Sequence, residues 1–102
     1  MTQLAIDTVY FGEPVTIGTT APFRNALGVA VDPDVVIITV KAPDGLVAEL
    51  TGNDLGNPET GMFEVTIIPD VAGAHGWRIE GTGNGADDVQ EGIFYVLSSV
   101  TG

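Results

Sequence analysis

The chain contains no cysteine, so it can form neither a disulfide nor a thiolate metal site. An antibody-type bridge between two sheets is therefore excluded, and packing alone must hold any β-sandwich together. The sequence also has no run of about 18 apolar residues that could cross a membrane. Its first seven residues lack the positive charge and the apolar block of a signal peptide. We expect a soluble, uncleaved protein made in a reducing cytoplasm.

Basic residues are the second scarcity, because Arg24, Lys41 and Arg78 stand against fourteen acidic residues and the net charge is -11. Binding to a phosphate backbone requires several Lys or Arg contacts. We therefore expect no nucleic acid partner, and the same charge argues against anionic membranes. A basic protein, a polysaccharide amine or a divalent cation stays open as a partner, as does a role of the charge in solubility alone.

Groups that could carry catalysis are few. His75 is the single histidine, and in a chain without cysteine it is the one candidate base of that kind for activating a nucleophile. Its place at the start of an expected strand favours a half-buried corner residue that is hydrogen-bonded to backbone. The acidic residues form no paired arrangement that predicts the cleft of a glycoside hydrolase. We predict no catalytic residue, no cofactor and no enzymatic activity.

Acidic and amide side chains gather in several loops. Hard cations bind several oxygen ligands, but none of these loops matches the helix-loop-helix calcium signature. Asp and Asn are also good turn residues, because their side chains accept local backbone hydrogen bonds. We therefore predict no metal site. The loop groups are Asp32 with Asp34, Asn53 with Asp54, Asn57 with Glu59, and Asp87 with Asp88.

Helical periodicity is absent, and turn residues separate short alternating runs, which is typical of an all-β sandwich. Strands are expected over 5–11, 15–20, 35–42, 46–50 and 62–68, followed by a strand with His75, Trp77 and Ile79 inward and a last strand with Phe94 and Val96 inward. Segments 22–33 and 51–61 are expected to be connections, the second crossing between sheets. Trp77 is the expected central core aromatic, because its ring removes a large area from water.

The stretch 70–96 predicts a corner, an alternating strand, a glycine-rich hairpin loop at 81–85 and a last strand. Many immunoglobulin-like sandwiches end in this way. The loop lacks the lysine and the strand-to-helix setting of a phosphate-binding loop. The expected fold is an all-β, immunoglobulin-like antiparallel β-sandwich of about seven strands, with residues 1–102 as one domain.

Two strands carry apolar residues at outward as well as inward positions, although sheets that face water normally alternate cleanly. In an immunoglobulin-like order these strands flank the one with Trp77, so their outward residues share one face. A contiguous apolar patch there would favour contact with a second copy or a larger assembly. A different register, or a cover formed by Tyr10–Phe11 or by the connection 22–31, stays open. The predicted interface residues are Val35, Ile37, Ile93, Tyr95 and Leu97.

Four motifs between residues 32 and 96 form a further pattern. They are Asp32-Pro33-Asp34 before a valine-rich strand, Pro43-Asp44-Gly45 at the next turn, Thr60-Gly61-Met62-Phe63, and the run from Gly73 to Gly83. This pattern resembles small immunoglobulin-like domains in virion proteins of tailed bacteriophages, with His75 where that pattern usually has an aromatic residue. The resemblance implies a virion accessory protein, such as a capsid decoration protein.

The expected function is therefore that of a non-enzymatic structural or binding module that docks on a phage capsid and stabilises the shell. The expected partner is the major capsid protein or another virion protein, with a homo-oligomer left open, and the expected location is the virion after synthesis in the host cytoplasm. One alternative is a tail-associated or cell-surface adhesion module that recognises host carbohydrate through Tyr10, Phe11 and Tyr95. The other alternative is a lytic or modifying enzyme that uses His75.

Overall fold

The computed structural model describes residues 8–98, and these residues form eight strands and one short 3-10 helix. Within this range no helix is long and apolar enough to cross a bilayer. The elements are β1 (Thr8–Tyr10), β2 (Val15–Gly18), β3 (Val35–Lys41), β4 (Val47–Thr51), η1 (Gly52–Asp54), β5 (Gly56–Glu59), β6 (Met62–Ile67), β7 (Gly73–Thr82) and β8 (Asp88–Leu97).

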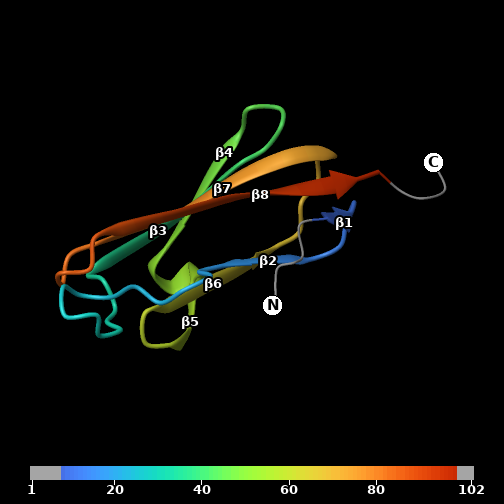
Figure 1. Cartoon of the computed structure of the whole chain (residues 1–102). Helices are drawn as coiled ribbons and strands as arrows, with labels where there is room; N and C mark the ends of the chain where they lie inside the picture. The colour runs from blue at the N-terminus through green and yellow to red at the C-terminus, as the bar shows by residue number, and fades with distance from the viewer. Residues whose placement is uncertain (1–7, 99–102) are drawn as a thin grey trace.

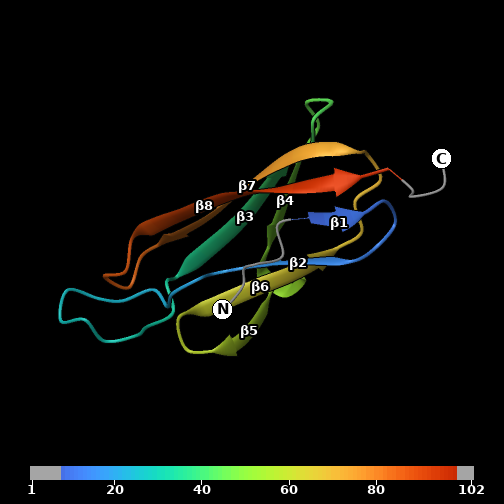
Figure 2. The same cartoon turned by 45° about the vertical axis from the view of Figure 1, so that its right-hand side comes forward.

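The strands form two layers, which Figures 1 and 2 show from two sides. The larger sheet has the order β1-β8-β7-β3-β4, and the smaller sheet has the order β2-β6-β5. The predicted two-sheet sandwich is confirmed. β3 is built almost wholly from β-branched residues, which favour extended backbone, and it pairs antiparallel with both β4 and β7.

Two parts of the strand assignment differ from the prediction. Segment 51–61 was expected to be a loop, but it contains η1 and β5, and β5 pairs with β6 through an irregular register. β1 pairs with β8 in parallel, so the sandwich is not antiparallel throughout. Residues 5–7 of the expected first strand lie outside the described residues. The remaining strands agree with the prediction to within a few residues at their ends.

The most buried aromatic residue is Phe23, so the prediction that Trp77 is the central core aromatic is wrong. Phe23 is fully buried, whereas Trp77 is half-buried and packs against the core. Phe23 belongs to the connection 22–33, and backbone hydrogen bonds to Gly61 and Val31 hold it so that its ring enters the core while residues 26–29 stay exposed at the end of the sandwich. Its ring lies against Gly81 of β7, and it meets Phe63 edge to face with centroids 6.2 Å apart.

Loop carboxylates accept backbone hydrogen bonds, which is the turn role considered for them. Asp32 accepts from the Gly61 amide at 2.7 Å, and Asp34 accepts from the Asn84 amide at 3.0 Å. Both bonds join segments that are far apart in sequence, so these two carboxylates hold loops against one another. The expected local turn bonds occur at Asp54 and Asp87, which accept from the amides of Thr51 and Gly83. The predicted turn at 43–45 is also confirmed, with the Gly45 amide donating to the Ala42 carbonyl at 2.9 Å.

Candidate interaction surface

The outer face of the larger sheet holds all five predicted interface residues. β3 and β8 flank β7, and the buried positions on β3 and β8 alternate with outward ones. Val35 is 50% exposed, while Ile37 is only half-buried and lies two positions further along β3. As a group, the β8 residues on this face are more exposed than the two β3 residues. The structure thus places both predicted sets on one side of the sandwich.

The predicted patch is not contiguous, which corrects the sequence-based picture. Ile37 lies opposite Glu80 of β7, whereas Ile93 lies opposite Gly76, four positions along the same strand. At about 3.3 Å per residue this offset is about 13 Å. A row of polar residues crosses the sheet between them, because Thr39, Arg78 and Glu91 are consecutive register partners. Sequence alternation gives the face of each residue but not the register between strands, so it could not reveal this separation.

The structure brings together a group of four exposed side chains on β1 and β8, which we call the β8 cluster. The parallel pairing places Tyr10 of β1 beside Leu97 of β8. Val9 and Val96, their neighbours in the two strands, are both buried, so Tyr10 and Leu97 face outward together. Exposed fractions are 42% for Tyr10, 56% for Ile93, 49% for Tyr95 and 43% for Leu97.

Sequence reasoning left Tyr10 out of the predicted interface and considered it as a possible cover for this face. β1 instead extends the sheet at its edge, so Tyr10 enlarges the cluster and does not bury it. Alternation around Val9 is the signal in the sequence that could have indicated the outward direction of Tyr10. The pairing of β1 with β8 connects segments more than 80 residues apart, and no local pattern encodes it.

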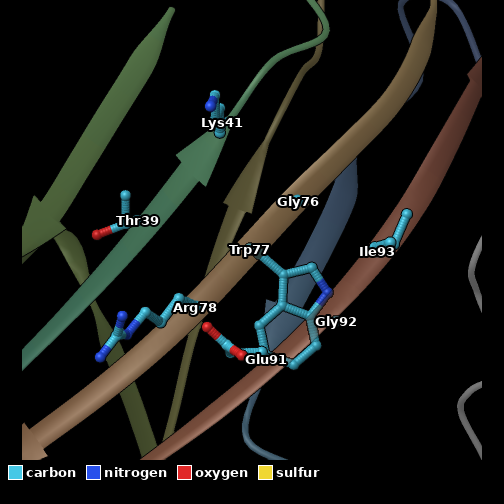
Figure 3. Close-up of a pocket in the computed structure, with 8 residues that line it drawn as sticks. All are labelled: Thr39, Lys41, Gly76, Trp77, Arg78, Glu91, Gly92 and Ile93. Atoms are coloured by element: carbon cyan, nitrogen blue, oxygen red, sulfur yellow. The ribbon is translucent and has the colours of Figure 1, made fainter. Parts of the chain in front are cut away.

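A shallow hollow lies next to the β8 cluster, over the centre of β7 (Figure 3). Gly76 leaves space at its floor, and Ile93 joins it to the cluster. Arg78 and Glu80 approach to 3.8 Å, but both side chains are about half exposed, so solvent screens the pair. The residues that line the hollow are Thr39, Lys41, Gly76, Trp77, Arg78, Glu91, Gly92 and Ile93.

His75 lies in the interior and not in an exposed site. It is 3% exposed, its ring stacks on Phe94 with centroids 4.8 Å apart, and its Nδ1 lies 3.2 Å from the Gly73 carbonyl oxygen. The expected backbone contact is present, and the burial is deeper than the half-buried corner that was predicted. Among residues 8–98, no group of three or more His, Asp or Glu side chains is placed to hold a metal ion.

Comparison with known proteins gives a fold and no family. No protein-family model matches the chain, and no curated protein matches it. Among solved structures, the crystal structure of the Lin-41 filamin domain is similar, with a TM-score of 0.62 and 20% sequence identity over 90% of this chain and 84% of that chain. This likeness confirms the predicted fold class, an immunoglobulin-like β-sandwich.

Proposed function

We propose that this immunoglobulin-like sandwich is a non-enzymatic binding module that docks on the capsid of a tailed bacteriophage as a decoration or accessory virion protein. The observation that carries the proposal is the β8 cluster, in which four apolar or aromatic side chains on two adjacent strands are each more than 40% exposed. Burying one large apolar side chain fully contributes about 1.5–3 kcal/mol, so a partner that covers the cluster gains substantial free energy. The resemblance of motifs 32–34, 43–45, 60–63 and 73–83 to phage virion domains supports the choice of partner.

A repeating shell makes a modest contact effective. Each copy of the module would cover a joint between capsid subunits with the β8 cluster, while the acidic loops face solvent. A protein that binds the assembled shell and not its free subunits stabilises the shell by mass action. Where copies also touch one another, their contacts add through effective concentration. The expected location is therefore the virion.

The β8 cluster can be tested against a matched position on the same face. Tyr95→Lys should abolish docking, because it places a charge in the middle of the cluster, whereas Val35→Asp should leave docking intact, because Val35 is equally exposed but lies beyond the polar row. Docking is measured by co-sedimentation with capsid shells of candidate tailed phages that lack their own decoration protein. Circular dichroism and thermal melts establish that both variants are folded.

Each outcome has a clear meaning. Loss of co-sedimentation in Tyr95→Lys alone supports docking through the β8 cluster. Equal binding by wild type and Tyr95→Lys would remove the cluster from the proposal. A failure of the wild-type protein to sediment with any shell would overturn the capsid role itself.

A host-carbohydrate adhesion module is the second candidate, and one observation favours it. Tyr10 and Tyr95 lie on adjacent paired strands, face the same side and are both about half exposed. Exposed aromatic rings on a flat sheet can stack against sugar rings and orient them. Binding on a glycan array that is lost in Tyr10→Ala and Tyr95→Ala, but kept in Val35→Ala, would favour adhesion over capsid docking.

A further inference from the structure

Asn84 lies in the turn between β7 and β8, at the same end of the sandwich as the connection 22–33 (Figures 1 and 2). Among the four asparagines it is the one that glycine follows, whereas Ala26, Asp54 and Pro58 follow the other three. The backbone amide of the next residue can attack an asparagine side chain, and a glycine there places no side chain in the way. Asparagine is a thermolabile residue. Asn84 therefore has the most reactive sequence context of the four.

The structure leaves the attacking amide open to solvent. Asn84 and Gly85 are both exposed. The turn is closed one residue later, where the Ala86 amide donates to the Gly83 carbonyl at 3.1 Å. No acceptor within residues 8–98 is bonded to the Gly85 amide. Because this amide must lose its proton as it attacks, the absence of an internal acceptor and the contact with water both favour the reaction.

One hydrogen bond restrains the side chain that is attacked. Nδ2 of Asn84 donates to the Asp32 carbonyl at 2.8 Å. The backbone amide of Asn84 donates to the Asp34 carboxylate at 3.0 Å, which holds the turn but not the side-chain amide. The net strength of a single hydrogen bond corresponds to about a two- to tenfold effect on an equilibrium. The folded state therefore slows the release of this side chain by about tenfold at most.

A carboxylate in place of the Asn84 amide would disturb this end of the sandwich. An ionised carboxylate has no proton to donate, so the bond to the Asp32 carbonyl would be lost. Two carboxylates already lie against Gly83: Asp87 accepts from its amide at 2.7 Å, and Asp34 occupies the space that a Cβ atom at Gly83 would need. A third negative charge one residue away would be repelled by both.

We propose that Asn84 is a site of spontaneous deamidation, and that the modification releases the β7–β8 turn from the connection 22–33. The Gly85 amide nitrogen attacks Cγ of Asn84 and closes a succinimide ring. The Cγ–Nδ2 bond breaks, and ammonia leaves with the proton of the Gly85 amide. Water then adds to one ring carbonyl and breaks its bond to the ring nitrogen. Attack at Cγ gives aspartate, whereas attack at the backbone carbonyl gives isoaspartate, which adds a methylene group to the main chain.

The reaction is followed in the full-length protein in mildly alkaline buffer, by peptide mass mapping and by the release of ammonia. We expect Asn84 to convert before the other three asparagines. In urea its conversion should be at most about tenfold faster, because a single hydrogen bond restrains the side chain. Asn84→Gly keeps the positive φ of 56° without strain and removes the reacting amide, so the early release of ammonia should disappear. Earlier conversion of another asparagine, a larger acceleration in urea, or early ammonia from Asn84→Gly would overturn the proposal.

Two variants with the same change of charge test the structural effect. Asn84→Asp has the side chain of the aspartate product, while Asn53→Asp places a carboxylate in a different exposed turn. Hydrogen exchange at Ala86, whose amide closes the β7–β8 turn, should be about two- to tenfold faster in Asn84→Asp, because the bond to the Asp32 carbonyl is lost. Exchange at Ala86 should be unchanged in Asn53→Asp. Equal exchange in the two variants would overturn the release of the turn.

Discussion

The ring of Trp77 leaves no room for a side chain at Gly92. The indole of Trp77 extends from β7 across to β8, beside Gly92 (Figure 3). A Cβ atom at position 92 would lie 2.4 Å from Cζ2 of that ring, a distance that forces the ring to move. A Cβ atom at Gly76, one residue before Trp77, would meet no atom within 4 Å. The two glycines on adjacent strands therefore have opposite tolerance for a side chain.

We expect Gly92→Ala to lower the free energy of unfolding by about 1–3 kcal/mol, because the added methyl overpacks the site. Trp77 is the single tryptophan, so its displacement should also shift the fluorescence emission to longer wavelength. Urea unfolding and emission spectra give both readouts. Gly76→Ala is the control and should leave both unchanged; equal effects of the two substitutions would contradict this account of the packing.

The second prediction for a single residue concerns the buried ring of Phe23. We expect Phe23→Ala to cost about 3–5 kcal/mol, because it opens a cavity where the ring now packs on Gly81 and Phe63. Phe11→Ala removes the same ring from a position that is 52% exposed and should change stability by less than about 0.5 kcal/mol. Urea denaturation of the two variants checks this. A similar cost for both would mean that Phe23 is not the core anchor.

At the scale of elements, the connection 22–33 between β2 and β3 is held by hydrogen bonds to the β5–β6 turn and to the β7–β8 loop. Asp32 bonds the Gly61 amide, and Asn84 bonds both Asp34 and the Asp32 carbonyl. These bonds close the end of the sandwich at which Phe23 enters the core. A segment with little strand pairing of its own is therefore a structural part of the domain.

We expect Asp32→Ala to lower the free energy of unfolding by about 1–3 kcal/mol, because it leaves the buried Gly61 amide without its 2.7 Å acceptor. Asp32→Asn keeps an oxygen acceptor in place and should cost less. Thermal melts rank the variants, and hydrogen exchange at Gly61 should be faster in Asp32→Ala. Full protection of that amide in the alanine variant would show that the carboxylate is not what holds it.

At the scale of the whole molecule, charge is the dominant feature. Fourteen acidic residues on 102 repel one another in the compact state, and three basic residues offset little of this. The outer face of the larger sheet carries two of the three cations, Lys41 and Arg78. The same face also carries Glu49, Glu80 and Glu91, so it is not a cationic surface.

We expect the melting temperature to rise between about 0.02 M and about 0.5 M NaCl, because salt screens this repulsion more strongly in the compact state. Calcium and magnesium chloride at matched ionic strength should have equal effects, since no group of three His, Asp or Glu side chains within residues 8–98 is placed to hold a metal ion. Differential scanning calorimetry measures all three salts. A melting temperature that does not change with NaCl would contradict the first expectation, and a rise specific to calcium would contradict the second.

Local patterns were enough to predict most of the strands and the fold class. Alternation identified Ile79, Phe94 and Val96 as inward residues, and turn chemistry at 43–45 identified the hairpin. The aromatic core was predicted less well, because Trp77 is the larger ring and lies in a clear strand. Phe23 lies in a segment without periodicity, where only the folded path of the chain decides burial.

The sequence by itself determined which residues of each strand face outward, because side chains alternate strictly along an extended backbone. It also determined the excess of negative charge and the lack of any covalent cross-link. Only the tertiary structure decided which outward residues are neighbours. The register of β3, β7 and β8 divides the predicted patch, the parallel pairing of β1 brings Tyr10 to Leu97, and hydrogen bonds between distant loops hold Asn84 against Asp32 and Asp34. These arrangements depend on pairing between distant segments, and the short-range periodicity of a strand carries no information about its partner.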